Sequence, residues 1–267
     1  MNKTAIYSLL VALFLPLISY FIIKQYTSNK PLVPRHFIYD SVSNRTEKGK
    51  IITDTFWHKL PDMEFTNQLG QKVSWKDMEG KTVVIDFFFT RCPTICPRLT
   101  ENMKMLQDEI RSSDKVGNRD PGFLQLLSIS IDPERDSVPQ LKKWADRFQI
   151  NPDHWWLLTG DKKATYDLSL NHMKLALLDG GKIDTSFVHT DYMVLVDKNR
   201  NIRGYYHGLD TTRVKELARD IVFLTLERDP KRKSVFAGQL EMLAIVFLLT
   251  LVGMGTMMYF LKKYKKG

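Results

Sequence analysis

Apolar and polar positions alternate in blocks along the middle of the chain, and the blocks predict strands followed by helices. Two mainly apolar runs, residues 81–89 and 123–131, are typical of strands buried on both faces of a sheet. Each run is followed by helix-type spacing, which predicts helices over residues 97–111 and 137–148. The repeated strand–helix order indicates parallel pairing of the two apolar strands.

Shorter elements complete this region. Residues 61–80 predict a β-hairpin that turns at Gly70. The later elements are a strand over 155–158, a helix over 162–170, a hairpin of strands 192–196 and 202–206, and a helix over 211–227. Together they predict an α/β fold in which helices cover both faces of a central mixed sheet.

The two ends of the chain are apolar in a different way. Residues 5–23 and 242–261 are almost uninterrupted apolar stretches of about 20 residues, the length that crosses a hydrocarbon core of about 30 Å. We therefore expect an N-terminal transmembrane anchor in residues 1–24 and a C-terminal transmembrane helix over 242–261. A cleaved signal peptide is the alternative at the N-terminus, but its apolar part would be long and no Ala-x-Ala site follows.

The other domain boundaries follow from these two stretches. Residues 25–50 contain Pro, Ser, Asn and Lys without apolar periodicity, and they are predicted to be a tether. The folded domain is expected to cover residues 51–228. A basic linker over 229–241 and a basic tail over 262–267 flank the second apolar stretch.

The net charge of +9 changes this picture little. Much of the excess flanks the two apolar stretches, where basic residues can contact anionic lipid headgroups. No basic run is interleaved with aromatic residues, so the membrane is an expected partner and nucleic acid is not. The lysines of the tail favour a cytoplasmic C-terminus, although the flanks of the N-terminal stretch do not agree cleanly.

The chemistry of the chain is concentrated in its only two cysteines, Cys92 and Cys96. They lie between the first apolar strand and the first helix, where Pro97 suits a first helical position. Because a helix N-terminus stabilises anions, we expect Cys96 at least to ionise more readily than a free cysteine. The neighbouring Arg91 is expected to lower the thiol pKa electrostatically. Such a thiolate pair can exchange disulfides or bind a soft metal.

Spacing and one histidine bear on the choice between these two chemistries. Three residues separate the cysteines, whereas the best-known disulfide-exchange motif has two. Thioredoxin places a cis-proline just before a later strand; here no proline occurs between Pro152 and Pro230, and His189 stands before the strand 192–196. Two thiolates and one imidazole form a soft ligand set that suits Cu(I), while Cu(II) or zinc could use it with a further ligand.

Other polar residues are weaker candidates. Asp132 and Asp136 follow the second apolar strand and are candidates for orienting metal ligands or a partner; the alternative is a capped turn. His172 and Met173 are interpreted as local packing in preference to a soft ligand pair. The remaining histidines considered are interpreted as surface or turn residues: His58, His154 and His207.

The stretch from about residue 56 to 227 resembles the Sco/SenC family. The matching segments are GKTVVIDFFFTRCPTICPRLTENM, LLSISIDPERDSVPQLKKWADRF, WWLLTG, FVHTDYMVLVD and IRGYYHGLD. Members are thioredoxin-like copper proteins involved in assembling the CuA centre of cytochrome c oxidase. The resemblance therefore implies a thioredoxin-like fold and copper ligation by Cys92, Cys96 and His189.

The resemblance also implies a function. A membrane-anchored copper chaperone would take copper from a donor and deliver it to the oxidase subunit that carries CuA. The redox state of Cys92 and Cys96 would control binding. The domain would face the periplasm or another extracytoplasmic side of the cytoplasmic membrane, or the intermembrane space in mitochondria. The apolar stretch at 242–261 departs from the family's familiar single N-terminal anchor.

Whether the protein is also an enzyme stays open. The alternative function is a thiol-disulfide oxidoreductase, with Cys92 and Cys96 as the redox pair, that draws on a thiol reductant to keep the cysteines of the oxidase or another extracytoplasmic partner reduced. A thiol peroxidase is disfavoured, because its usual Pro-x-x-x-Thr-x-x-Cys pattern is absent.

Overall fold

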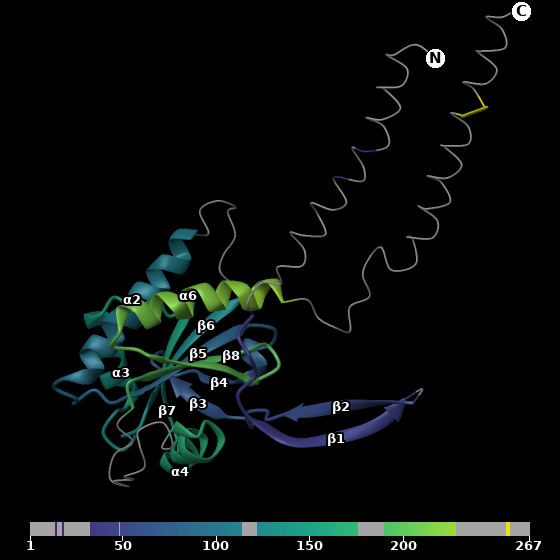
Figure 1. Cartoon of the computed structure of the whole chain (residues 1–267). Helices are drawn as coiled ribbons and strands as arrows, with labels where there is room; N and C mark the ends of the chain where they lie inside the picture. The colour runs from purple at the N-terminus through teal and green to yellow at the C-terminus, as the bar shows by residue number, and fades with distance from the viewer. Residues whose placement is uncertain are drawn as a thin grey trace, which may run out of the picture. The chain divides into compact units, whose positions relative to one another are not determined.

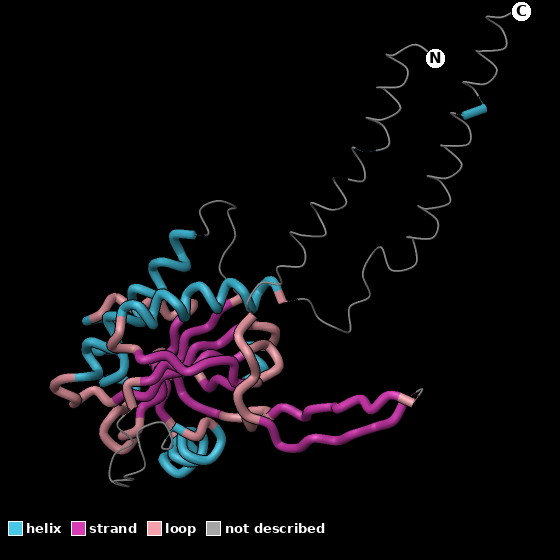
Figure 2. Tube along the Cα trace, in the orientation of Figure 1, coloured by secondary structure: helices cyan, strands magenta, loops and turns pink. Residues whose placement is uncertain are grey.

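The computed structural model describes residues 33–47, 49–113, 122–175 and 190–227, together with residues 14, 18, 255 and 256. The chain divides into two units, Met1–Leu226 and Glu227–Gly267, and the strands and main helices below belong to the first (Figures 1 and 2). None of the helices within the described ranges is long and apolar enough to cross a bilayer. The apolar stretches predicted to do so lie almost wholly outside those ranges, and they stay predictions.

A seven-stranded mixed sheet has the order β4-β3-β7-β6-β5-β8-β9. Its strands are β3 (Glu64–Asn67), β4 (Lys72–Ser74), β5 (Thr82–Phe88), β6 (Leu124–Ser130), β7 (Trp155–Thr159), β8 (Tyr192–Val196) and β9 (Ile202–His207). The central strands β5, β6 and β7 run parallel, and the others pair antiparallel. Every residue of β5 and β6 is buried, which confirms the sequence expectation that both faces of these strands are covered.

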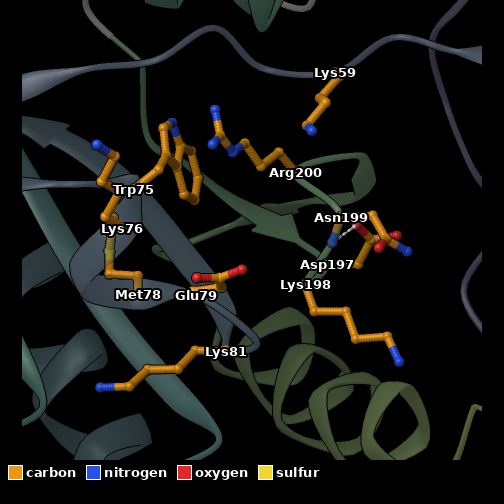
Figure 3. Close-up of a pocket in the computed structure, with 10 residues that line it drawn as sticks. All are labelled: Lys59, Trp75, Lys76, Met78, Glu79, Lys81, Asp197, Lys198, Asn199 and Arg200. Atoms are coloured by element: carbon orange, nitrogen blue, oxygen red, sulfur yellow. Dashed lines mark hydrogen bonds between the residues drawn. The ribbon is translucent and has the colours of Figure 1, made fainter.

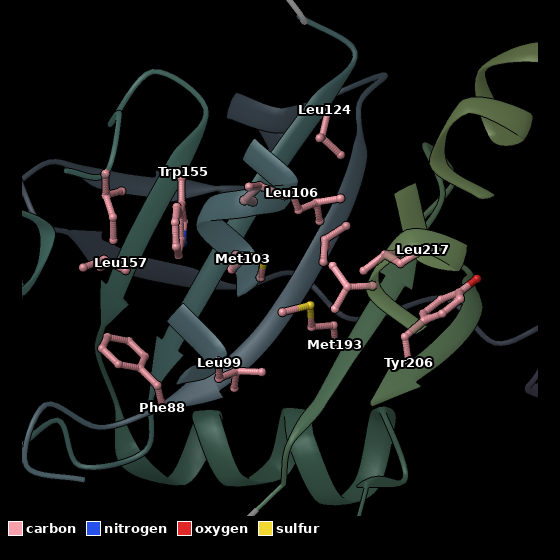
Figure 4. Close-up of a cluster of buried hydrophobic side chains, with 14 of the residues drawn as sticks. Phe88, Leu99, Met103, Leu106, Leu124, Trp155, Leu157, Met193, Tyr206 and Leu217 are labelled. Atoms are coloured by element: carbon pink, nitrogen blue, oxygen red, sulfur yellow. The ribbon is translucent and has the colours of Figure 1, made fainter. Parts of the chain in front are cut away.

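Helices cover the two faces of this sheet unequally. The helical elements are η1 (Trp75–Met78), α2 (Ile95–Ser113), α3 (Val138–Arg147), α4 (Lys162–Asp167), the π-helix η3 (Leu168–His172) and α6 (Thr211–Leu226). Helices α2, α3 and α6 pack on the face to which Val84 and Phe88 of β5 point, and this core is shown in Figure 4. The other face, with Val83 and Ile85, is covered by η1 and η3. The predicted covered mixed sheet is therefore confirmed.

A two-stranded ribbon stands apart from the main sheet (Figure 1). Strand β1 (Tyr39–Glu47) pairs antiparallel with β2 (Lys50–Trp57), and Gly49 lies in the connecting turn with φ of +76°. Residues 39–47 fall inside the segment expected to be a tether, so that expectation does not hold for them. The physical reason is that this ribbon exposes side chains on both faces, and it therefore carries no apolar alternation from which a strand could be predicted.

The helix predicted over 162–170 is split in two. The α-helix α4 starts at the N-cap Asp161, whose Oδ1 accepts a hydrogen bond from the backbone N–H of Ala164 at 2.7 Å. It ends at Asp167, and the π-helix η3 continues to His172.

Candidate metal centre

Both cysteines lie where strand β5 passes into helix α2. Cys92 is in the loop after β5, and Cys96 is in the first turn of α2. Both are free thiols and each is only 4% exposed. The backbone N–H of Cys96 donates a hydrogen bond to Sγ of Cys92 at 3.4 Å. The two side chains are thus held together in one buried turn at the carboxyl end of a central parallel strand, where α/β proteins commonly place their sites.

The expectation that Cys96 ionises more readily than a free cysteine is wrong, whereas the pKa of Cys92 is lowered. Burial raises the pKa of Cys96 far above its ordinary value, and the neighbouring Cys92 and Asp86 act in the same direction. Burial also opposes ionisation of Cys92, but hydrogen bonds from the backbone N–H groups of Cys96, Thr94 and Ile95 outweigh it, and the pKa of Cys92 is lowered. Because α2 begins at Ile95, the N–H groups at its start have no partner within the helix, and those of Ile95 and Cys96 donate to the sulfur of Cys92.

This difference predicts unequal reactivity. We expect Cys92 to react with iodoacetamide at least about ten times faster than Cys96 near pH 8, because the thiolate is the nucleophile. Both cysteines lie between Arg91 and Arg98, on one tryptic peptide. The rates are therefore best measured on the reduced single variants Cys96→Ser and Cys92→Ser. Equal rates, or faster labelling of Cys96, would contradict the assignment.

Asp136 binds the loop that connects β5 to α2, residues 89–94, which is called the cysteine loop below. Its side chain is fully buried and accepts hydrogen bonds from the backbone N–H of Thr90 at 3.1 Å, the hydroxyl of Thr90 at 2.5 Å and the hydroxyl of Ser130 at 2.6 Å. Thr90 precedes Cys92 by two residues. The carboxylate of Asp132 instead pairs with Arg135 at 3.3 Å. Of the two candidate aspartates, Asp136 therefore contacts the cysteine loop.

Asp86 is a residue near the site that sequence reasoning missed. It lies in β5, is 1% exposed, and its Oδ1 has no hydrogen-bond partner in the part of the chain that the structure describes. Burial raises the pKa of this carboxyl to about 7, against the opposing effect of a hydrogen bond from Ser128. Its charge in turn disfavours ionisation of Cys96. The sequence did contain a signal for this residue, because Asp86 is the single acidic residue inside the otherwise apolar run VVIDFFF.

His189, the third predicted ligand, lies outside the described residues. The residues just after it are described. Asp191 accepts the backbone N–H of Gly208 at 2.7 Å through its carbonyl oxygen, and Gly208 accepts the side-chain amide of Asn102 at 2.6 Å. Asn102 lies in α2, the helix that carries Cys96. The chain next to His189 is thus tied to the helix of the cysteines, and the ligand role of His189 stays a prediction.

No group of three or more His, Cys, Asp or Glu side chains is arranged to hold a metal within the described ranges. Met173 is completely buried in the core, which agrees with the packing interpretation. His172 instead faces His58 across a 3.1 Å hydrogen bond between ring nitrogens. His207 receives or donates a hydrogen bond at 2.7 Å with the hydroxyl of Tyr192 and is half exposed, as expected of a surface residue.

A separate cavity of about 450 Å³ lies near the other end of β5 (Figure 3). Its wall includes Lys81, just before β5, and Arg200, whose guanidinium lies 5.5 Å from the ring centre of Trp75. The lining residues are Lys59, Trp75, Lys76, Met78, Glu79, Lys81, Asp197, Lys198, Asn199 and Arg200. They include no thiol and no imidazole, so this cavity offers no soft-metal ligands comparable to the cysteine pair.

Comparison with known proteins agrees with this arrangement. The chain is 30% identical over 174 residues to a SCO1 protein homolog of Bacillus subtilis, covering 65% of this chain and 86% of the relative. It is 27% identical over 150 residues to a Stutzerimonas stutzeri protein whose name describes copper binding, covering 55% and 68%. The solved structure of BsSco, described as a member of the Sco family of cytochrome c oxidase assembly proteins with a disulfide switch, matches with 28% identity and a TM-score of 0.53, covering 65% of this chain and 98% of that one.

The decisive match is with a family model. The SCO1/SenC model matches residues 57–225, which include both cysteines, Asp86, Asp136 and His189. The matched range also spans the whole seven-stranded sheet. The chain therefore belongs to the SCO1/SenC family.

Proposed function

We propose that this protein is a membrane-anchored copper chaperone that binds copper through Cys92, Cys96 and His189 and delivers it to the CuA site of cytochrome c oxidase. The observation that carries the proposal is the pair of buried free thiols held in one turn at the end of β5. Family membership supports copper as the cargo, because one relative is named for copper binding and BsSco is described among oxidase assembly proteins.

The two thiols would contribute to binding in different ways. Cys92, with its lowered pKa, is the thiol that supplies a thiolate first. Cys96 is disfavoured as an anion by burial, so its proton would leave only when a metal ion replaces it. A recipient could then take the ion by ligand exchange. Oxidation of both thiols to a disulfide, with two electrons and two protons passing to a partner disulfide, would remove both sulfur ligands and gate delivery.

The proposal places the folded domain outside the cytoplasm. Two apolar stretches of membrane-spanning length, at residues 5–23 and 242–261, would hold it at the membrane by both ends. An even number of spans puts both termini on one side, and the basic tail favours the cytoplasm for that side. The domain between them would then face the periplasm or the intermembrane space, where an oxidase CuA domain could be reached.

The test is Cu(I) binding by the reduced full chain in detergent without oxygen. We expect one tightly bound Cu(I) per chain in the wild type, and a loss of at least about a hundredfold in affinity in Cys92→Ser and in His189→Ala. His207→Ala is the matched control, because His207 is a half-exposed histidine that the proposal does not use. Competition with a chromophoric Cu(I) chelator measures the affinities. A wild type that cannot compete with the chelator, or an unchanged affinity in Cys92→Ser, would sink the proposal.

A thiol-disulfide oxidoreductase is the second candidate function. One observation favours it: a thiol of lowered pKa beside a thiol of raised pKa suits an attacking and a resolving cysteine. Disulfide exchange needs only the thiols, so His189→Ala should leave it intact while removing most Cu(I) binding. Rapid reduction of a model disulfide by the wild type, together with weak Cu(I) binding, would favour the reductase over the chaperone.

A further inference from the structure

The cavity near the start of β5 carries a surplus of positive charge (Figure 3). Five of its ten lining residues are lysine or arginine, and two are acidic. They come from three parts of the chain: Lys59 after β2, residues 75–81 in and after η1, and residues 197–200 in the turn between β8 and β9. Because a cleft lined by one sign of charge concentrates its potential, this cavity attracts anions.

Asp197 does not offset the positive charge, because its carboxylate is used inside the domain. Oδ2 accepts a hydrogen bond from the buried Arg203 at 3.0 Å. Oδ1 accepts the backbone N–H groups of Asn199 at 2.8 Å and Asn201 at 2.9 Å. The side chain of Asp197 is only 5% exposed. The exposed Glu79 is therefore the one acidic residue of the lining that faces the cations without such partners.

The four lysines of the lining form no ion pair with a carboxylate in the part of the chain that the structure describes. The ammonium group of Lys81 donates instead to the neutral amide oxygen of Gln125 at 3.3 Å. Arg200 does pair with Asp62, but the side chain of Asp62 is 85% exposed. Lysine is a common ligand of phosphate groups, so the lining suits a phosphate-bearing anion.

The cavity lies at the end of the main sheet where the chain enters and leaves the folded domain. Val83 near the start of β5 pairs with Val196 at the end of β8, and β9 begins beside them at Ile202. The entering chain is held there, because the backbone N–H of Phe37 donates to the carbonyl oxygen of Ile202 at 3.2 Å. Helix α6 packs on β9 and runs back from the cysteine end, so it ends at Leu226 on the cavity side (Figure 1).

The segments that join this end to the two apolar stretches are also basic. Residues 24–35 contain three basic and no acidic side chains, and residues 228–233 contain four basic and one acidic. Residues 24–32, which join the first apolar stretch to Val33, can span at most about 35 Å. The proposed membrane anchoring would therefore keep the cavity end of the domain close to the lipid headgroups, where anionic lipids attract basic residues.

We propose that this cavity binds the phosphate-bearing headgroup of an anionic phospholipid and thereby orients the domain on the membrane. The inference rests on the membrane anchoring in the proposed function. Lys76 and Lys81 lie on one side of the cavity and Lys198 on the other, so they would approach a phosphate from two directions (Figure 3). The cysteine pair lies beyond the far end of β5, which is seven residues or roughly 20 Å long, and it would face away from the bilayer toward a partner.

The test measures how fast Lys81 is acetylated in the reduced, copper-free full chain. The chain is reconstituted in nanodiscs of phosphatidylcholine with or without phosphatidylglycerol, and acetic anhydride, an uncharged reagent, is followed by mass spectrometry. A bound headgroup would cover the amine, so we expect acetylation of Lys81 to be at least about fivefold slower with phosphatidylglycerol. Lys215 in α6 is exposed and outside the cavity, and it should react equally in both nanodiscs.

A double variant, Lys76→Gln with Lys198→Gln, removes two charges from exposed positions of the cavity wall. The protection of Lys81 should then fall to less than about twofold. The matched control is Lys143→Gln with Lys163→Gln, which makes the same change in net charge at exposed positions outside the cavity and should keep the protection. Equal loss of protection in the two double variants would show an effect of total charge and would overturn the cavity site.

Equal acetylation of Lys81 in the two kinds of nanodisc would also overturn the proposal. The same protection by free glycerol phosphate in phosphatidylcholine nanodiscs would reassign the cavity to a soluble phosphate compound and overturn the lipid headgroup as its ligand. Extraction of the chain from vesicles by alkaline carbonate would refute the anchoring, and this inference with it. Cu(I) affinity should be unchanged in the Lys76→Gln and Lys198→Gln variant, so a failure of lipid binding and a failure of copper binding are read separately.

Discussion

Replacing Asp86 with asparagine is expected to raise the free energy of unfolding by about 4 kcal/mol at pH 8 and by less than about 1 kcal/mol at pH 4. The carboxyl of Asp86 is buried in β5, and burial raises its pKa from 3.8 to about 7. Between these two values the folded state holds a proton that the unfolded state has lost. Stability therefore falls as the pH rises from about 4 to 7, and it stays low above that window. Asparagine cannot ionise, so the penalty disappears.

Urea unfolding of the reduced protein at a series of pH values measures this effect. Asp153→Asn is a suitable control, because Asp153 is exposed and its replacement should leave the pH profile unchanged. A second readout is available in the site: loss of the Asp86 charge should make Cys96 easier to ionise and faster to alkylate. If wild type and Asp86→Asn lose stability equally between pH 4 and 8, the buried carboxyl is not the source of the pH dependence.

Asp136→Ala is expected to destabilise the domain by about 3–5 kcal/mol. The fully buried carboxylate accepts hydrogen bonds from the N–H and hydroxyl of Thr90 and from the hydroxyl of Ser130. Removing it leaves these donors buried without their acceptor, and hydrogen bonds to a charged group are among the stronger ones. Chemical unfolding at pH 7 measures the loss.

The cysteine loop should loosen in the same variant. Thr90, which lies two residues before Cys92, would lose its hydrogen bonds to Asp136. Cys92 should then become more accessible to alkylating reagents, and the affinity for Cu(I) should fall. Asp132→Ala is the matched control, because the ion pair of its carboxylate is with Arg135, whose side chain is largely exposed. Such a pair contributes about 1 kcal/mol or less to stability. Similar losses of stability in the two variants would show that Asp136 has no special role in positioning the loop.

Strands, helices and the location of the cysteines could be read from local patterns. The apolar runs around Ile85 and Leu127 require burial on both faces whatever their neighbours are, so they predicted β5 and β6 correctly. The position of Cys92 and Cys96 at the junction of β5 and α2 followed from the same periodicity. The β1–β2 ribbon was missed, because its side chains are largely exposed on both faces and leave no such pattern.

The sequence by itself determined the α/β fold, the family and the thiol pair, because these depend on burial periodicity and on the identity and spacing of residues. Only the tertiary structure decided which thiol is the more acidic, since that depends on where the first N–H groups of α2 point and on the depth at which Cys96 is buried. It likewise brought Asp136 to Thr90 and His58 to His172, contacts across 46 and 114 residues of chain. Hydrogen bonding and ionisation act over a few ångströms in space, and no local pattern in the sequence records which distant residues come that close.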